Sequence, residues 1–263
     1  MYYEIHGEGE PLIMISGFSA DHLIWNEVIP RLKNNYKVIV FDNRGAGQTD
    51  IPHKPYSIEE MSHDTAQLCH QLNIKKAHFI GNSMGGFILQ HLAYQYPDLV
   101  QTAIISNSTT SVKCNFHLYV DAQLELLKAN APRSAMIKAS CSWAFSYKFL
   151  TRPGMLDNLI ELGLNAPYPF SIAGYEGQYA ALCQFDSTDW LHKITTPTMV
   201  VSGNQDLIFP EPLVKILVNH IPHAKYYSFC DCGHLPFMEY PEQFAEMVKE
   251  FISGYRMKLI TNN

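Results

Sequence analysis

The stretch of sequence that decides the fold is IGNSMGG at residues 80–86. An apolar run precedes it and a run with helical spacing follows it at residues 87–94, so we predict a buried strand, a sharp turn and a helix. So sharp a turn strains the backbone of Ser83 and leaves room only for small residues two positions away, where Gly81 and Gly85 stand. Gly-x-Ser-x-Gly is the pattern of a nucleophile elbow, which presents a serine hydroxyl at the edge of a sheet. A glycine-rich turn that holds a serine by chance is the alternative.

The composition is that of a globular protein with a large core, because 47% of the 263 residues are hydrophobic and 17% are charged. The formal net charge of −6 argues against nucleic-acid binding and against an anionic membrane surface. No signal peptide is visible, and no apolar run approaches the roughly 18 residues that span a bilayer. We therefore expect a cytoplasmic protein with neither nucleic-acid nor membrane partners.

The six cysteines are scattered along the chain. Without an export signal they are predicted to be free thiols in a reducing cytoplasm. Cys230 and Cys232 stand too close together for a zinc site, and no other cluster of histidines, cysteines or carboxylates has ligand spacing. We therefore expect no metal and no cofactor.

Strand-like and helix-like segments alternate through the first part of the chain. A capping box, Ser57 with Glu60, opens a predicted helix that ends near Leu72. Apolar runs predict strands at residues 2–6, 12–16, 37–41, 76–80 and 100–106. This order of strands and helices indicates an α/β fold, with a mostly parallel, doubly wound sheet and helices on both of its faces.

The alternation stops after residue 108 and resumes at residue 191. The intervening segment lacks buried-strand runs and carries helical stretches rich in aromatic side chains. Two more strands and two more helices then follow, at residues 197–202, 224–229, 210–221 and 241–253. We therefore predict a core domain of residues 1–108 and 191–263. A helical cap, residues 109–190, is expected to be inserted after the sixth strand, at the end of the sheet where Ser83 lies.

A serine nucleophile needs a base to take its proton and a carboxylate to orient that base. Reacting groups lie at the carboxyl ends of the strands in an open α/β sheet. Of the twelve histidines, His234 fits best because it lies in the loop after the last predicted strand, and His22 is its one serious rival. Asp206 follows the preceding strand, whereas Asp231 is too near His234 in sequence to pair comfortably. Serine, aspartate and histidine also stand in the expected chain order, so we predict a triad of Ser83, Asp206 and His234.

The tetrahedral intermediate of such a reaction needs N–H donors for its oxyanion. The backbone N–H of Met84 is one candidate, because it lies at a helix start where the dipole assists. The N–H of Phe18, in the turn after the strand at residues 12–16, is the other. An ordinary strand-to-helix turn at this second position is the alternative.

Together these motifs resemble those of the α/β-hydrolase family over essentially the whole chain. The matching pieces are SGF at 16–18, DNRGAG at 42–47, GNSMG at 81–85, GNQD at 203–206 and GHLP at 233–236. Within the family, the chain is similar to a group of small cytoplasmic esterases and lactonases. This group includes 3-oxoadipate enol-lactonase and the pimeloyl-carrier-protein methyl esterase. Ser16 departs from the histidine that many relatives have before the oxyanion glycine, which affects packing more than chemistry because the donor is a backbone N–H.

A serine nucleophile excludes the dehalogenases and epoxide hydrolases of this family that use aspartate. The expected reaction is hydrolysis of a carboxylic ester or lactone, a small molecule, through an acyl-enzyme. Several alternatives remain open: a methyl esterase for a carrier-bound acyl chain, a carbon–carbon bond hydrolase, a perhydrolase, or a ligand receptor without catalysis.

Two features of the cap bear on the substrate. Trp143 and Phe145 are candidates for the pocket wall, although they could equally form the core of the cap. A basic run without any acidic residue comprises Lys128, Arg133, Lys138, Lys148 and Arg152. This run is either a solvated face or a site that attracts an acidic partner, such as a carrier protein or a carboxylate-bearing lactone.

Overall fold

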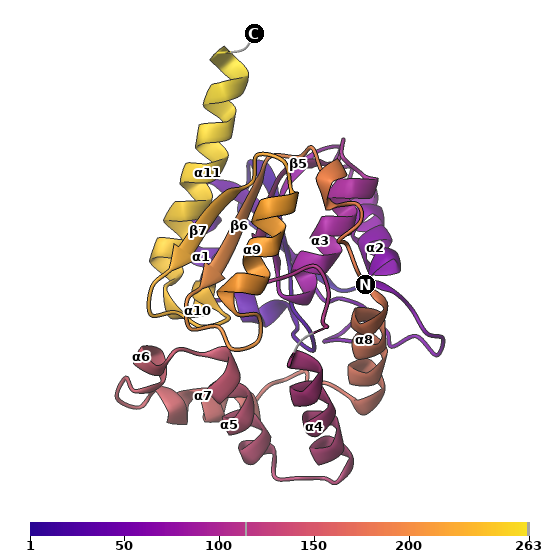
Figure 1. The fold of residues 1–263 in the computed structure, drawn as a ribbon, viewed down its shortest axis with the longest axis vertical. Helices are drawn as coiled ribbons and strands as arrows, with labels where there is room; N and C mark the ends of the chain where they lie inside the picture. Colours follow the sequence, from indigo (N-terminus) through magenta and orange to yellow (C-terminus); the bar gives the residue numbers. More distant parts are fainter. Residues whose placement is uncertain (114, 262–263) are drawn as a thin grey trace.

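The apolar runs of the sequence form one seven-stranded sheet in the computed structural model, which describes residues 1–113 and 115–261 (Figure 1). Its strand order is β1-β3-β2-β4-β5-β6-β7, and every neighbouring pair is parallel except β1 with β3. The mostly parallel, doubly wound sheet predicted from the sequence is therefore confirmed. The strands are β1 (Tyr3–His6), β2 (Glu10–Ile15), β3 (Tyr36–Phe41), β4 (Ala77–Asn82), β5 (Val100–Ser106), β6 (Thr198–Gly203) and β7 (Lys225–Phe229).

Strands in the middle of the sheet are covered on both faces. Every residue of β4 and of β6 is buried, which is why consecutive apolar residues, and not alternating ones, form the middle of each strand. The edge strands β1 and β7 are only partly buried and carry polar side chains. The burial pattern thus distinguishes the central strands of the sheet from the edge strands.

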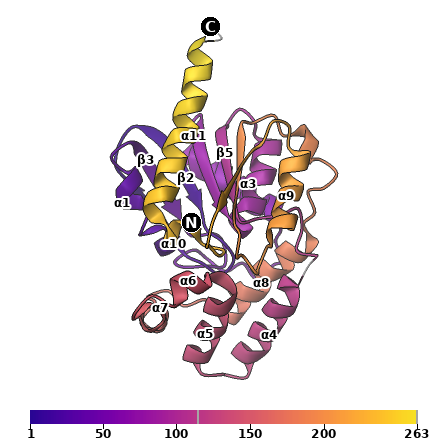
Figure 2. The same cartoon turned by 60° about the vertical axis from the view of Figure 1, so that its left-hand side comes forward.

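Helices cover both faces of the sheet, and each face has its own apolar cluster (Figures 1 and 2). One cluster joins the sheet to α2, α3 and α9, through residues such as Met61, Phe87 and Leu217. The other joins it to the short helices η1 and α1 and to α10 and α11, through Trp25 and Phe244 among others. These helices are η1 (His22–Trp25), α1 (Ile29–Leu32), α2 (Ile58–Gln71), α3 (Met84–Gln95), α9 (Glu211–His220), α10 (Pro236–Glu239) and α11 (Pro241–Thr261).

The start of α2 shows the predicted capping box. Glu60 N donates to Ser57 Oγ at 3.2 Å, and Ser57 N donates to Glu60 Oε2 at 3.0 Å. The two residues thus satisfy each other's unpaired N–H groups at the helix start. Among the helices that the structure describes, none combines the length and the apolar character needed to cross a bilayer.

Five helices lie at the carboxyl end of the strands, between β5 and β6 of the chain (Figure 2). They follow the fifth strand, so the expected insertion after a sixth strand was wrong: the five strands expected before residue 108 are β1 to β5, and β6 comes after the helices. The name cap is kept here for residues 109–190, and its treatment as a separate domain stays a prediction. The five helices are α4 (Phe116–Lys128), α5 (Arg133–Ala144), α6 (Tyr147–Leu150), α7 (Met155–Leu164) and α8 (Ile172–Gln184), and the 3-10 turn η2 (Leu191–Lys193) leads back to β6.

Candidate active site

Ser83 occupies the sharp turn between β4 and α3. Its backbone has φ 54° and ψ −117°, a combination that L-residues rarely adopt and that surrounding structure has to maintain. The glycines on either side have no room for a side chain: a Cβ on Gly81 would lie 2.2 Å from Gly85 O, and a Cβ on Gly85 would lie 2.1 Å from Ile15 O. The sequence pattern is therefore required by the close approach of β2, β4 and α3, which together hold the serine at the strand end.

His234 and Asp206 meet at the same end of the sheet. His234 Nδ1 lies 2.8 Å from Asp206 Oδ2, although the residues come from loops after β7 and β6. The other oxygen of Asp206 accepts the backbone N–H groups of Ile208 at 2.8 Å and Phe209 at 3.1 Å. Both side chains are buried, with 4% of His234 and 3% of Asp206 exposed. The backbone N–H groups hold the Asp206 carboxylate in place independently of the imidazole. Because the carboxylate contacts Nδ1, the Nε2 atom of the ring is left for other partners.

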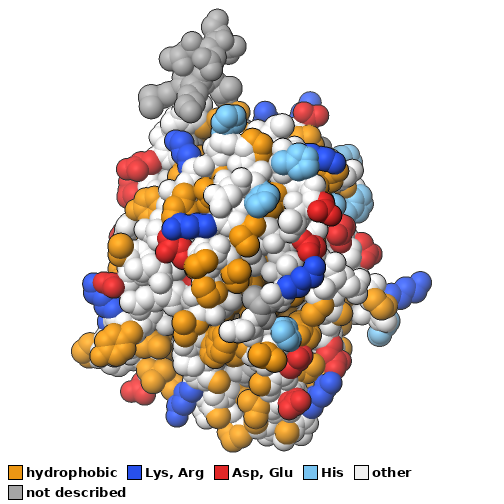
Figure 3. Space-filling model, viewed as in Figure 1, with side chains coloured by type: hydrophobic (Ala, Val, Ile, Leu, Met, Phe, Trp, Pro, Cys, Tyr) orange, Lys and Arg blue, Asp and Glu red, His pale blue; other side chains and the backbone are white. Residues whose placement is uncertain are grey.

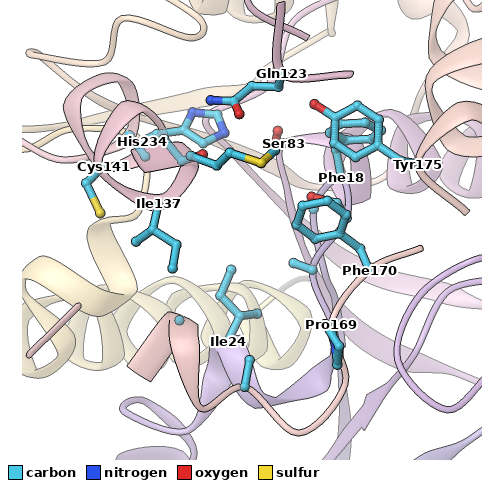
Figure 4. Close-up of a pocket in the computed structure, with 18 of the residues that line it drawn as sticks. Phe18, Ile24, Ser83, Gln123, Ile137, Cys141, Pro169, Phe170, Tyr175 and His234 are labelled. Atoms are coloured by element: carbon cyan, nitrogen blue, oxygen red, sulfur yellow. The ribbon is translucent and has the colours of Figure 1, made fainter. Parts of the chain in front are cut away.

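Ser83 and His234 line one cavity of about 760 Å³ between the sheet and the cap (Figure 4). Figure 4 draws the side chains of Ser83, His234 and Gln123 on one side of this cavity and Ile137 of the cap on another. Most of the wall is apolar or aromatic, and it includes Phe116, Leu127, Met136, Ile137, Phe170 and Tyr175. Such a cavity fits a mostly apolar ligand whose reacting group lies beside the serine.

The turn after β2 passes directly beside the serine. A Cβ on Gly17 would lie 3.2 Å from Ser83 Cβ, and Phe18 lines the cavity. Side chains brace this turn at both ends: Asn43 Nδ2 donates to Ser16 O at 3.1 Å, and Ser19 N donates to Gln178 Oε1 at 2.8 Å. The N–H of Phe18 lies within this braced segment, and Met84 N begins α3 on the opposite side of the serine.

His22 lies in a separate buried cluster. Its Nδ1 is 2.8 Å from Asp42 Oδ1, and its Nε2 is 3.3 Å from Glu4 Oε1. It is not among the cavity-lining residues in the described part of the chain. Both ring nitrogens are therefore engaged away from Ser83, so the structure does not bring the rival histidine to the serine.

The two aromatic candidates of the cap have different surroundings. Phe145 lines the cavity and stacks on Phe149 with ring centroids 5.1 Å apart. Trp143 does not line it within the described residues, and its ring packs on Tyr119 at 5.0 Å. The expectation that Trp143 forms the pocket wall is thus not met, because its side chain lies behind Tyr119, which itself faces the cavity.

Most of the basic run is neutralised or stacked. Lys128 lies 2.6 Å from a carboxylate oxygen of Glu176, and Lys148 lies 3.3 Å from one of Asp231. The guanidinium of Arg152 stands over the Phe149 ring, 4.7 Å from its centroid. On the face shown in Figure 3, Lys and Arg side chains at the cap end lie beside Asp and Glu side chains. Of the five cations, only Arg133 lines the cavity as the structure describes it.

Burial shifts the pKa of several titratable groups in the cavity wall. Burial raises the pKa of the Cys141 thiol to about 11 and raises that of the Tyr119 hydroxyl. A protonated thiol is a poor nucleophile, so Cys141 does not compete with Ser83 at neutral pH. Burial also raises the pKa of Asp21, which lies on the core side of the cavity.

Sequence reasoning missed three polar residues around this site. Asn107 Nδ2 donates to Asp206 Oδ2 at 2.9 Å and to Gly233 O at 3.2 Å, and thereby joins the two loops. Gln123, 5% exposed, lines the cavity from α4. Glu239 is buried at the end of α10. For Asn107 a signal existed, because it follows β5 directly, but an asparagine is not the carboxylate that a triad requires.

No group of three or more histidine, cysteine or acidic side chains that could hold a metal ion occurs among residues 1–113 and 115–261. The five described cysteines are all free. The site itself contains a serine, an imidazole and backbone N–H groups at the start of α3, which suit acyl transfer.

The fold and these side chains identify the class of protein. The chain belongs to the α/β hydrolase fold family, whose profile it matches over residues 10–241. This membership confirms the resemblance inferred from the sequence motifs.

Individual relatives span nearly the whole chain. The protein is similar to the putative carbamate hydrolase RutD of Pantoea ananatis, with 25% identity over 96% of this chain and 93% of that protein. It is similar to 3-oxoadipate enol-lactonase 1 of Acinetobacter baylyi, with 27% identity over 95% of this chain and 92% of the other. Among solved structures, the putative non-heme bromoperoxidase BpoC of Mycobacterium tuberculosis H37Rv superposes with a TM-score of 0.88 at 27% identity, over 97% of this chain and 96% of that one.

Proposed function

We propose that the protein is a serine hydrolase that cleaves a carboxylic ester or lactone through an acyl-enzyme. The observation that carries the proposal is the hydrogen bond of His234 to Asp206, with the imidazole and the strained Ser83 lining the same cavity. Similarity to an enol-lactonase and to a putative carbamate hydrolase supports acyl transfer to water as the reaction class.

The proposed reaction has two halves. Ser83 Oγ attacks the substrate carbonyl carbon while His234 Nε2 takes the hydroxyl proton, and Asp206 stabilises the resulting imidazolium. The N–H groups of Phe18 and Met84 donate to the oxyanion. The intermediate then collapses: the bond to the leaving oxygen breaks, and that oxygen takes the proton from His234. Water, deprotonated by His234, attacks the acyl-enzyme in the same way and releases the acid and the free serine.

The cavity favours a neutral substrate with an apolar acyl or alcohol part. Its wall is mostly hydrophobic, and its two charged lining residues are Asp21, on the core side, and Arg133, which is exposed on the cap. Arg133 is the one Lys or Arg among the described lining residues, and its exposed position on the cap leaves a carboxylate beside Ser83 without a partner deep in the cavity. An acidic carrier protein remains a weaker proposal, since three of the five cap cations already have partners. The five free cysteines fit a cytoplasmic location.

A perhydrolase is the second candidate, favoured by the close superposition on the putative bromoperoxidase. In that case hydrogen peroxide would replace water in the second half and would release a peroxy acid. Comparing peroxy-acid and carboxylic-acid release from one ester, with and without added peroxide, distinguishes the two reactions.

The experiment that tests the proposal is turnover of an activated neutral ester by the Ser83→Ala variant. The change removes one oxygen and leaves the turn, which the glycines set. Loss of a triad member lowers kcat by roughly four to six orders of magnitude. Retention of more than about a tenth of the wild-type kcat would place the nucleophile elsewhere. A ligand receptor without catalysis would show no turnover even in the wild-type protein.

A further inference from the structure

Glu239 is a buried carboxylate that the proposed reaction does not use. It lies at the end of α10 and is 2% exposed. One oxygen, Oε1, accepts Gly233 N at 2.8 Å and Ser146 N at 3.1 Å, and the other, Oε2, accepts the Ser146 hydroxyl at 2.5 Å. A single side chain thus joins the residue before His234 to the segment of the cap between α5 and α6.

The peptide between Gly233 and His234 is held on its other sides as well. Gly233 O accepts Asn107 Nδ2 at 3.2 Å, and His234 N donates to Ala144 O, in the cap, at 2.6 Å. A Cβ on Gly233 would lie 2.4 Å from Ala144 O and 2.9 Å from Glu239 Oε1. Only glycine allows the cap and α10 to approach the His234 loop this closely, so the backbone position of the imidazole depends on contacts from the cap.

The groups around the Glu239 carboxylate are hydrogen-bond donors, which need acceptor oxygens and do not need a negative charge. Burial raises the pKa of Glu239, and the hydrogen bonds from Ser146 and Gly233 and the nearby Arg152 act in the opposite direction. Arg152 reaches the backbone oxygen of Glu239 at 3.5 Å. Cys232 and Tyr240 are also close enough to interact with Glu239, and burial raises the pKa of both. An amide in place of the carboxylate could keep both backbone hydrogen bonds and donate to the Ser146 hydroxyl oxygen.

We propose that Glu239 is a positioning residue for His234, through which docking of the cap segment 144–146 sets the place of the base beside Ser83. The cap then has two roles, because it walls the cavity and completes the scaffold of the catalytic imidazole. This inference rests on the proposed function. It adds that the geometry of the base depends on a contact separated by 93 residues in sequence.

A matched pair of variants tests the proposal. Glu239→Met keeps the length and the apolar stem but removes both oxygens, whereas Glu239→Gln keeps one oxygen for the N–H groups of Gly233 and Ser146 and can donate its amide N–H to the Ser146 hydroxyl. We expect kcat for an activated neutral ester to fall about 10- to 100-fold in Glu239→Met, the range that a small misplacement of a reacting group produces. KM should change less than about threefold. Glu239→Gln should retain wild-type kcat, and so should Glu246→Met, a control on the exposed face of α11.

A readout independent of turnover is the downfield proton resonance of the His234 Nδ1–H that faces Asp206. It should broaden or shift in Glu239→Met and persist in Glu239→Gln. If Glu239 only anchors the cap, Glu239→Met would raise KM or lower the melting temperature while kcat and the resonance stay unchanged, and the proposal would be overturned. A Glu239→Gln variant as defective as Glu239→Met would also overturn it, because the acceptor role would not be what matters.

The test also covers a Glu239→Met variant that fails to fold and a failure of the proposed function. If Glu239→Met does not fold, Ser146→Ala takes its place, because it removes one of the three hydrogen bonds to the Glu239 carboxylate. This variant should lower kcat and should change the His234 resonance in the same way. If kcat and the resonance were unchanged, the proposal would be overturned. If Ser83→Ala retains turnover, the proposed function fails, and the resonance still decides whether Glu239 positions His234.

Discussion

His234 Nδ1 lies 2.8 Å from Asp206 Oδ2, and the same oxygen accepts Asn107 Nδ2 at 2.9 Å. The carboxylate therefore receives hydrogen bonds from the imidazole, an amide side chain and two backbone N–H groups. Because every partner is buried or part of a loop end, Asp206 cannot turn away from the imidazole without leaving donors unpaired. The pair is a rigid unit built from the ends of β5, β6 and β7.

Asp206→Asn should preserve this shape and lose the activity. An asparagine amide would present an N–H₂ group to Nδ1 or force the other tautomer of the imidazole, which places a proton on Nε2 where the base has to accept one. We expect kcat for an activated ester to fall by about 10⁴-fold. Asp231→Asn, a half-exposed site three residues before His234, is the control and should stay within about threefold of wild type. Equal kcat values for the two variants would show that Asp206 does not orient the base.

The variants His22→Ala and His234→Ala distinguish the roles of the two buried histidines. His22 bonds to Asp42 and Glu4, away from the cavity, so its loss leaves the buried Asp42 with one hydrogen-bond donor fewer. The free energy of unfolding should fall by about 1–3 kcal/mol, while kcat of the folded fraction is unchanged. His234→Ala should show the opposite pattern, with a folded protein and no turnover. Urea unfolding and ester kinetics on both variants check this, and a reversal of the two patterns would make His22 the base.

The raised pKa of Glu239 predicts that the free energy of unfolding depends on pH. Burial raises its pKa above the ordinary value of 4.5, so the folded state holds a proton more tightly than the unfolded state does. The resulting stabilisation is fully present below the ordinary pKa and is lost as the pH rises through the folded value. Glu239→Gln removes this dependence, so its free energy of unfolding relative to wild type should increase over that window and then level off. Urea titrations at several pH values measure the difference, and a flat or falling difference would contradict the assignment.

Arg133 and Lys138 are the cap cations to change in order to test whether charge in the cap affects substrate binding, because Lys148 and Arg152 already contact other groups. The Arg133→Glu/Lys138→Glu variant should raise KM for a carboxylate-bearing ester at low salt and leave KM for a neutral ester unchanged. The penalty should shrink as salt rises, because the Debye length falls to about 8 Å at physiological ionic strength. Equal KM values for acidic and neutral esters at low salt would show that these cations do not influence the substrate.

The sequence predicted the parts of the molecule that depend on local patterns. Continuous apolar runs marked β4 and β6 because both faces of these strands are covered, and the elbow glycines marked the turn at Ser83. Loops directly after strands supplied Asp206 and His234 as candidates. Each of these features is encoded within a few neighbouring residues.

The cap could not be predicted in the same detail, because its contacts join distant segments. Glu239 and Ser146 are 93 residues apart, and the partner of Lys128 lies on another helix of the cap. Trp143 and Phe145 differ by two positions on or beside α5, yet one packs on Tyr119 and the other faces the cavity. Aromatic content alone therefore does not distinguish a residue of the cavity wall from a residue packed within the cap.

Trapping the acyl-enzyme shows whether Ser83 is the nucleophile. Wild-type protein is mixed with a neutral p-nitrophenyl ester, quenched in acid within the first turnover and digested for mass spectrometry. We expect the mass of one acyl group on the peptide that contains Ser83, and none in Ser83→Ala. An acyl group on another residue, or an adduct that persists in Ser83→Ala, would show that Ser83 is not the nucleophile.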